Sequence, residues 1–339
     1  MEIFRKGLFP NSPHSGTIKR YRNSVPRMDA FFTQLIQLVV NGISVGSIIA
    51  LSAVGLTLSY GILRLSNFAH GDFMTVGAYF TLLFNAIGIN IWVSMVFSAI
   101  LTIGVTLLSE ALLWSPMRKK RATATTLIII SIGLALFLRN GIIFVWGGGN
   151  QRYNLPVARA LSFGGITIPF NQLVVIVLAV VAIAGLHYLL QNTKIGKAMR
   201  AVADDLDLAR TTGINVDRVV LFTWIIAGGL TALGGSMLGL VEAVRPNMGW
   251  FLILPLFASV ILGGIGNPYG AIAGGLIIGI AQEVGAGISD LLTPIASNPI
   301  AALIINTRLF TAQYKLGIAL LIMVIVLLVR PQGLFKGTA

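Results

Sequence analysis

The chain has 339 residues, of which 56% are hydrophobic and only 10% are charged, and its mean hydropathy is +0.88. Soluble domains carry about 25% charged residues, so this composition excludes a soluble protein and predicts a membrane protein surrounded by lipid. The net charge of +13 does not indicate nucleic-acid binding, because the basic residues lie in short segments beside apolar spans, without interleaved aromatic residues.

Residues 1–29 are basic and rich in Pro, Ser and Asn, and they contain no apolar run. A cleavable signal needs an apolar region of about 7–15 residues and a small-residue cleavage site. The segment therefore predicts a disordered cytoplasmic tail, with Met28 as an alternative translation start and an organellar transit peptide as the weaker reading. Residues 30–339 are expected to form one membrane domain.

Eight apolar stretches follow the tail, and a membrane-spanning helix needs about 20 such residues. They cover residues 31–63, 67–87, 91–114, 125–147, 172–191, 218–240, 251–288 and 314–330. The first and the seventh are too long for one crossing, and both contain several glycines. The pattern predicts an all-α polytopic transmembrane helical bundle of about 8–10 spans, with Gly-rich packing and broken or re-entrant helices.

Positive charge predicts the orientation of these spans, since basic loops stay cytoplasmic. The basic segments are the tail, 118–121, 192–218, and Arg330 with Lys336. All of them share one side if 31–63 and 251–288 each cross twice, which gives ten crossings with both termini cytoplasmic. The stretch 289–313 is then an external loop, and the count falls if either long stretch is re-entrant.

Glycines recur at intervals of four residues in several spans, which places small residues on single helix faces. Such faces let helix backbones approach closely in lipid, and ordinary helix packing without a transport role is the simplest interpretation. The pairs are Gly42 and Gly46, Gly235 and Gly239, Gly266 with Gly270 and Gly274, and Gly275 and Gly279.

A polar segment, 65–73, lies between two apolar spans and contains a glycine. Its composition is typical of a broken helix whose backbone lines a cavity. The residues that we expect on a translocation pathway or gate there are Asn67, His70, Gly71 and Asp72. The alternative is an interfacial turn anchored by Arg64 and His70.

Charges at the bilayer centre cost about 2.5–3.5 kcal/mol, so they tend to face the protein interior or a cavity. Glu283 lies in the middle of a predicted span beside Gln282, and it is a further candidate for the pathway or gate, with interhelical packing as the alternative. Most of the other intramembrane polar residues lie near predicted span ends, where the side chain reaches the interface: His70, Asp72, Glu110, Arg139, His187 and Glu242.

The segment 192–218 carries five of the 24 Lys and Arg and four of the 11 acids, and its Ala and Leu spacing suits a short amphipathic helix. A membrane protein with such a helix between its spans is expected to present it to a partner. Gly196-Lys197 is no phosphate-binding loop, because position 191 is Gln where that motif needs Gly. Cysteine is absent and the three histidines are scattered, so we expect no metal and no cofactor on this chain.

Several dispersed motifs resemble one family of membrane proteins. Residues 67–72 read N-F-A-H-G-D, which resembles the N-F-A-H-G-[ED] signature of high-affinity branched-chain amino acid permeases, the membrane subunits of ABC importers. Residues 196–201 (G-K-A-M-R-A), 213–218 (G-I-N-V-D-R), 262–267 (L-G-G-I-G-N) and 330–335 (R-P-Q-G-L-F) are similar to the same family.

The resemblance implies a bacterial inner-membrane permease subunit, without its own ATP-binding motif, that imports branched-chain or other neutral amino acids. The implied partners are a second permease subunit in a heterodimer, two cytoplasmic ATPases that use ATP, and an extracytoplasmic substrate-binding protein. The helix after Gly196 resembles the segment that couples to an ATPase, with these residues: Gly196, Arg200, Asp204, Asp205, Asp207 and Gly213. A urea or short-chain amide permease and an ion-coupled secondary carrier are the alternatives.

Overall fold

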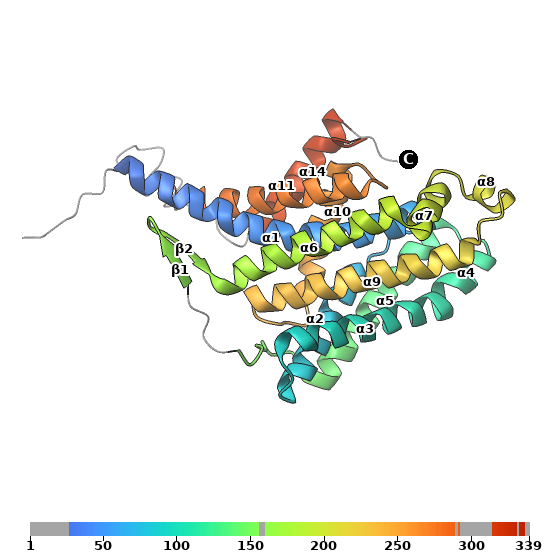
Figure 1. The fold of residues 1–339 in the computed structure, drawn as a ribbon, viewed down its shortest axis with the longest axis horizontal. Helices are drawn as coiled ribbons and strands as arrows, with labels where there is room; N and C mark the ends of the chain where they lie inside the picture. Colours follow the sequence, from blue (N-terminus) through green and yellow to red (C-terminus); the bar gives the residue numbers. More distant parts are fainter. Residues whose placement is uncertain (1–26, 156–159, 289–290, 292–313, 331, 336–339) are drawn as a thin grey trace, which may run out of the picture.

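The computed structural model describes residues 27–155, 160–288, 291, 314–330 and 332–335. This part of the chain is almost entirely helical (Figure 1). The helices are α1 (Arg27–Leu63), α2 (His70–Ala86), α3 (Ile91–Ser109), α4 (Ser115–Lys119), α5 (Ala124–Trp146), α6 (Phe170–Asn192), α7 (Lys194–Asp204), α8 (Leu206–Thr211), α9 (Val216–Val241), α10 (Met248–Gly263), α11 (Pro268–Ala286) and α14 (Lys315–Val329). A π-helical turn, Glu110–Trp114, joins α3 to α4.

Six of the described helices are long and apolar enough to cross a bilayer: α1, α3 together with α4, α5, α6, α9 and α11. Helices α10 and α14 are shorter but also apolar. The prediction of an all-α polytopic membrane protein is therefore confirmed. The expected tail, 1–29, falls almost wholly outside the described residues, and so does the expected external loop, 289–313.

Polar side chains mark where the apolar helices begin. The side chain of Asn90 accepts a hydrogen bond from the Trp92 N–H at the start of α3, and that of Thr123 accepts one from the Thr126 N–H at the start of α5. Asn215 caps α9 in the same way. Each cap satisfies a backbone donor that the first turn of a helix leaves without an intrahelical partner.

The stretch 31–63 forms one continuous helix, so the prediction that it crosses twice is wrong. Helix α1 has 37 residues, which corresponds to a length of about 55 Å against a hydrocarbon core of about 30 Å. Its glycines do not break the helix, because they contact neighbouring helices: Gly42 and Gly46 face α11, and Gly55 faces α9. The count of ten crossings with both termini cytoplasmic therefore does not hold.

The stretch 251–288, by contrast, does divide into two helices, as the sequence predicts. Helix α10 ends at Gly263, and Gly264 and Gly266 follow with φ angles of 101° and 87°, a region that favours glycine. The Asn267 side chain then accepts hydrogen bonds from the N–H groups of Tyr269 and Gly270 and caps α11. The two helices pack against each other, because Gly263 and Gly270 meet backbone to backbone.

A seam of glycines joins α1 to α11. A Cβ built at Gly42 would lie 2.6 Å from the Ile280 Cα, and one at Gly279 would lie 2.2 Å from the Gly46 Cα. Gly275 lies equally close to Ala50 of α1. The close-packing role predicted for these glycines is confirmed, and two helix backbones approach each other along several turns.

A small β hairpin, which the sequence did not predict, precedes α6. Strands β1 (Ala160–Phe163) and β2 (Ile166–Pro169) pair antiparallel, with Leu161 opposite Ile168. Gly164 and Gly165 both have positive φ, as a two-residue hairpin turn requires. The Gln37 side chain of α1 binds β2 through two hydrogen bonds. It donates to the Thr167 carbonyl at 3.0 Å and accepts from the Thr167 N–H at 2.8 Å.

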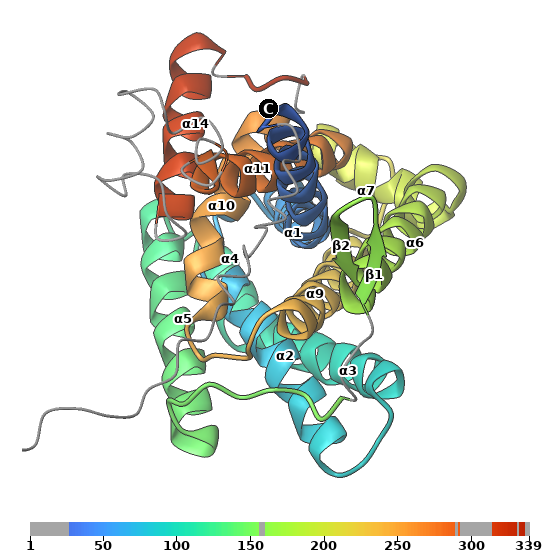
Figure 2. The same ribbon diagram turned by 90° about the vertical axis from the view of Figure 1, so that its left-hand side faces the viewer.

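The bundle has two distinct ends (Figure 1). We call the end with α4, α7 and α8 the inner end, and the end with the β hairpin and the start of α1 the outer end; Figure 2 views the molecule from the outer end. The described C-terminal residues also reach the inner end, where the Leu334 N–H donates to the Leu262 carbonyl at 2.7 Å. The basic segments 118–121 and 192–218 and Arg330 thus share the inner end, which the positive-inside rule assigns to the cytoplasm.

Single cysteines test this orientation without background, because the chain contains no cysteine of its own. We expect Arg152→Cys at the outer end to react with an impermeant thiol reagent added to intact cells. Lys120→Cys and Asp204→Cys, both exposed at the inner end, should react only after the membrane is permeabilised. Labelling of position 204 in intact cells would reverse the orientation.

Candidate functional site

The segment 65–73 does break a helix, as its composition predicts. Helix α1 ends at Leu63, Arg64 follows with a φ of 52°, and α2 begins at His70. The alternative was an interfacial turn anchored by Arg64 and His70. Arg64 is exposed, but the His70 side chain is only 2% exposed, so His70 does not reach an interface. Asn67 is fully buried, and its side chain accepts a hydrogen bond from the Ala69 N–H at 3.1 Å.

His70 joins three helices at one point. Its Nε2 atom lies 2.9 Å from the Ser52 carbonyl oxygen of α1 and 3.0 Å from the Thr231 hydroxyl of α9. The Phe68 N–H donates to the Ser131 hydroxyl of α5 at 3.2 Å. The broken segment is thus tied to the interior of the bundle by polar contacts, and such contacts satisfy groups that would be costly to bury alone.

Asp72 forms a buried ion pair with Arg139. The sequence had predicted each of the two residues near the end of a span, where its side chain reaches the interface. The two carboxylate oxygens of Asp72 accept from Nε and Nη2 of Arg139 of α5, at 3.1 and 3.2 Å. Asp72 is fully buried and the Arg139 side chain is 12% exposed. The guanidinium also lies over the ring of Trp250, 4.4 Å from its centroid, so neither charge depends on reaching the interface.

Gly71 is a point of backbone contact between α2 and α10. A Cβ built at Gly71 would lie 2.2 Å from the Gly249 carbonyl oxygen, and one at Gly249 would lie 1.8 Å from the Gly71 carbonyl oxygen. The Gly249 N–H also donates to the Thr75 hydroxyl at 3.1 Å. The structure thus brings Asn67, His70, Gly71 and Asp72 together at one helix junction, and their role in a pathway or gate stays a prediction.

Glu283 lies far from that junction, at the outer end of α11. Its carboxylate forms an ion pair with the Lys315 ammonium of α14 and lines a cavity open at this end of the bundle. Gln282 donates to the Lys315 carbonyl at 2.9 Å. Glu283 therefore makes an interhelical contact between α11 and α14, and its role in a pathway or gate stays a prediction.

The predicted coupling helix is two helices rather than one. Helix α7 ends at Asp204, and Asp205 adopts an extended conformation and caps α8, accepting from the N–H groups of Asp207 and Leu208 at 2.9 Å each. The sequence signal was present, since Asp is a preferred N-cap residue. The prediction that Gly213 ends the helical segment is confirmed, because it follows α8 with a φ of 88°.

Helix α7 is fastened to the bundle by its apolar side. Gly196 lies against α6 so closely that a Cβ would be 2.3 Å from the Leu189 carbonyl oxygen. Met199 and Val202, on the same helix, are buried. Asp204, Asp205 and Asp207 are exposed, as is the apolar side chain of Leu208 at 62%. The segment presents acids and one large apolar group outward from the inner end.

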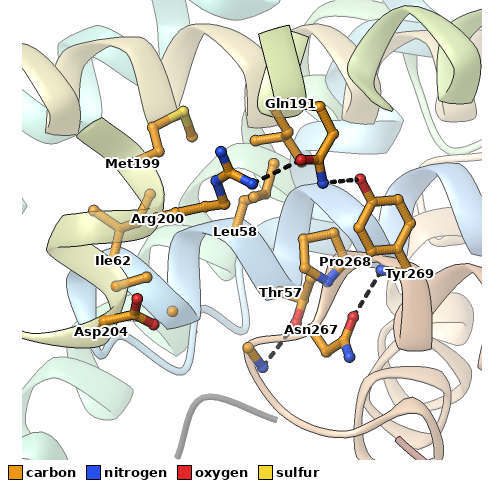
Figure 3. A pocket seen from close by; sticks show the side chains of 14 residues that line it. Thr57, Leu58, Ile62, Gln191, Met199, Arg200, Asp204, Asn267, Pro268 and Tyr269 are labelled. Atoms are coloured by element: carbon orange, nitrogen blue, oxygen red, sulfur yellow. Dashed lines mark hydrogen bonds between the residues drawn. The ribbon is translucent and has the colours of Figure 1, made fainter. Parts of the chain in front are cut away.

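A chain of hydrogen bonds links α7 to α11 across a cavity of ≈ 260 Å³ (Figure 3). Arg200 of α7 donates to the Gln191 side chain at 2.7 Å, and Gln191 donates to the Tyr269 hydroxyl at 3.0 Å. That hydroxyl also lies 2.9 Å from Nδ1 of His187. These hydrogen bonds connect α7 to the first turn of α11.

Gln191 and Tyr269 were not predicted from the sequence, although Arg200 was. Both flank features that the sequence did identify, because Gln191 ends the span before the coupling segment and Tyr269 follows Asn267-Pro268. A polar side chain at the inner end of an apolar span, such as Gln191, could have indicated a contact with the coupling segment. What the sequence could not supply was their proximity, since 78 positions separate the two residues.

Comparisons of the sequence with known proteins identify a family of membrane transport proteins. The family described as the permease component of branched-chain amino acid transport systems matches residues 38–327. The high-affinity branched-chain amino acid transport system permease protein BraD of Pseudomonas aeruginosa is 29% identical over 314 residues, which is 88% of this chain and 95% of that protein. LivH of Escherichia coli K12, which bears the same description, is 28% identical over 327 residues, or 91% of this chain and 97% of LivH.

Methanocaldococcus jannaschii also has a relative of this chain. The probable branched-chain amino acid transport permease protein LivH of Methanocaldococcus jannaschii is 32% identical over 247 residues, which is 70% of this chain and 77% of that protein. The family match extends from the middle of α1 to the end of α14. The chain therefore belongs to the branched-chain amino acid transport permease family.

Proposed function

We propose that this chain is the membrane-spanning permease subunit of an ABC importer for branched-chain or other neutral amino acids. It would form part of the translocation pathway and couple to separate ATPases. The family membership makes it a transport subunit, not an enzyme, and a multi-pass protein of the bacterial inner membrane. The substrate class follows the names of its relatives, which are branched-chain amino acid permeases.

The observation that carries this proposal is the α7–α8 segment at the inner end. It is bonded to α11 through Arg200, Gln191 and Tyr269, and it exposes acids and Leu208. An ion-coupled carrier working alone would not require a polar element of this kind, so the segment favours a transporter driven by a partner. Charges on a docking surface set register and partner choice more than affinity.

The partners that we propose are a second permease subunit, two cytoplasmic ATPases and an extracytoplasmic substrate-binding protein. ATP would be used by the ATPases, because this chain has Gln191 where a phosphate-binding loop needs Gly and Ala198 where it needs Ser or Thr. No cofactor is assigned to the chain itself. A urea or short-chain amide permease remains the second candidate within the same architecture.

Reconstituted uptake tests the function directly. The chain is co-expressed with the proposed ATPases and second permease, and the purified complex is placed in liposomes with the binding protein outside and ATP inside. We expect ATP-dependent accumulation of labelled leucine, with alanine weaker and urea absent. Uptake of urea in preference to leucine would replace the proposed substrate, and leucine uptake driven by an ion gradient without ATP would replace the mechanism.

Charge reversal on α7–α8 tests the coupling role. We expect Asp204→Lys with Asp207→Lys to weaken association with the ATPase by about 2- to 30-fold, because each exposed ion pair contributes about 0.2–1 kcal/mol. Asp205 is left intact, since its loss would remove the cap of α8. The measurement is ATPase co-purification together with leucine uptake.

Two variants control that experiment. Lys120→Glu reverses an exposed charge at the inner end but outside the segment 192–218, and it should associate as the wild type does. Asp204→Asn with Asp207→Asn keeps the shape and removes the charge, and it should fall between wild type and reversal. Unchanged association and uptake in the reversed variant would exclude the coupling role.

A further inference from the structure

A cavity of ≈ 580 Å³ is lined by residues at the outer end of the bundle. Its wall comes from five parts of the chain: α1, the segment after α5, the end of α9 with the following segment and α10, the end of α11, and the start of α14. A volume of this order accommodates a small organic molecule.

Two ion pairs line this cavity, and they come from different elements. Glu242 accepts from Nη2 of Arg245 at 2.9 Å, and Glu283 pairs with the Lys315 ammonium. All four residues belong to the wall. The cavity therefore offers two carboxylates and two cations, which balance to zero net charge.

The rest of the wall contains several large apolar side chains. Phe251, Leu252 and Pro255 of α10 contribute to it, together with Leu238 of α9 and Leu316 of α14. Phe251 is among the exposed large hydrophobic residues of the protein. An apolar surface beside balanced charges matches a molecule with a charged head and an aliphatic body.

Backbone contacts hold these charges in place. Gln151 and Val244 exchange two hydrogen bonds of 2.9 Å each, which fixes the segment that carries Glu242 and Arg245. The Gln282 side chain binds the Lys315 carbonyl. The backbone that carries the charged side chains is thus held in place by the scaffold.

The pair nearer to solvent can exchange partners at little cost. The Glu242 and Arg245 side chains are 43% and 48% exposed, and exposed ion pairs contribute little to stability. The contact with Glu242 uses one guanidinium nitrogen of Arg245, whereas a guanidinium has five N–H donors. Arg245 can therefore bind an incoming carboxylate while Glu242 binds an ammonium group.

We propose that this outer cavity is a subsite for a zwitterionic α-amino acid, with the charge pairs on its head group and the α10 wall on its aliphatic side chain. The inference rests on the proposed function and names a site in this chain for the transported molecule. Neutral amides such as urea lack both charges, and inorganic ions lack the apolar body. The arrangement therefore selects against both classes.

Direct binding to the transporter tests the proposal without the binding protein. The purified complex with its ATPases is titrated with leucine, with 4-methylpentanoate, which lacks the ammonium group, and with 3-methylbutylamine, which lacks the carboxylate. We expect each analogue to bind about tenfold or more weakly than leucine, since each loses a charge-assisted hydrogen bond. Binding of either analogue within twofold of leucine overturns the proposal.

Variants locate the site within the chain. Glu283→Gln with Lys315→Gln removes both charges of one pair while keeping hydrogen-bonding groups, and we expect leucine to bind about tenfold more weakly. Arg245→Gln, whose pair is exposed and whose loss does not threaten the fold, should weaken leucine binding several-fold. Arg152→Gln, an exposed cation of the outer end that is outside the cavity wall, is the matched control and should bind as the wild type does.

The outcomes separate this inference from the proposed function. ATP-dependent leucine uptake by the wild type, together with unchanged leucine binding in the Arg245 and double variants, refutes the subsite and leaves the function intact. Absence of ATP-dependent neutral amino acid uptake refutes the function itself. Both measurements use the same assembled complex.

Discussion

Replacing Arg139 by leucine is expected to remove most of the assembled transporter from the membrane. The change leaves the fully buried Asp72 carboxylate without its bidentate partner. Removing one partner of a buried pair costs about 3–5 kcal/mol, while folded proteins are stable by only about 5–15 kcal/mol. We expect a lower melting temperature of the purified complex and a reduced yield of monodisperse material.

The double variant Asp72→Asn with Arg139→Met distinguishes an unpaired charge from a general packing defect. It removes both charges, and replacing a buried ion pair by groups of similar size is often neutral or stabilising. We expect it to recover most of the stability lost in Arg139→Leu. Arg152→Leu, at an exposed position, should behave as the wild type. A single Arg139→Leu variant as stable as the wild type would show that the ion pair does not support the fold.

The second large effect is expected for Gly71→Leu, which should abolish uptake of leucine. Even the first carbon of the new side chain would lie 2.2 Å from the Gly249 carbonyl oxygen, and backbone cannot yield as a flexible side chain does. Overpacking of this kind costs about 1–3 kcal/mol or more. Helices α2 and α10 must therefore separate. Uptake is measured per assembled complex, so that a lower yield is not mistaken for lost transport.

Gly104→Leu is the matched control for that variant. Gly104 is a glycine of α3 whose added Cβ would meet nothing within 4 Å, so the same substitution there should preserve uptake. Gly71→Ala, which adds only the offending carbon, should fall between the two. Normal uptake by Gly71→Leu would mean that the contact between α2 and α10 opens freely.

The local features of the fold were predictable because their causes are local. Asn267-Pro268 after a run of glycines stops α10 and caps α11, and Gly213 takes the positive φ that ends the α7–α8 segment. The same reasoning failed for 31–63, where Gly42 and Gly46 lie inside a continuous helix. A glycine that breaks a helix and a glycine that packs against another helix look alike until the neighbour is known.

The candidate site was predictable in part for the same reason. The sequence located a polar element after Gly196 and selected Arg200, because amphipathic spacing is visible along the chain. The pairs that define the geometry join distant positions: Asp72 with Arg139, and Glu283 with Lys315. Neither pairing follows from spacing, since helix packing alone determines which charges meet.

The continuity of α1 has a consequence for how motion crosses the membrane. One end of this helix, from Thr57 to Ile62, lines the inner cavity beside α7, while Val45 lines the outer cavity. Helix α11 has the same reach, with Tyr269 at one cavity and Glu283 at the other, about 21 Å apart along its axis. The glycine seam packs the two helices backbone against backbone, and each helix is continuous between its two cavities. We therefore expect a tilt of α11 at Tyr269 to move Glu283 as well. The inner and outer cavities would then change shape together and not independently.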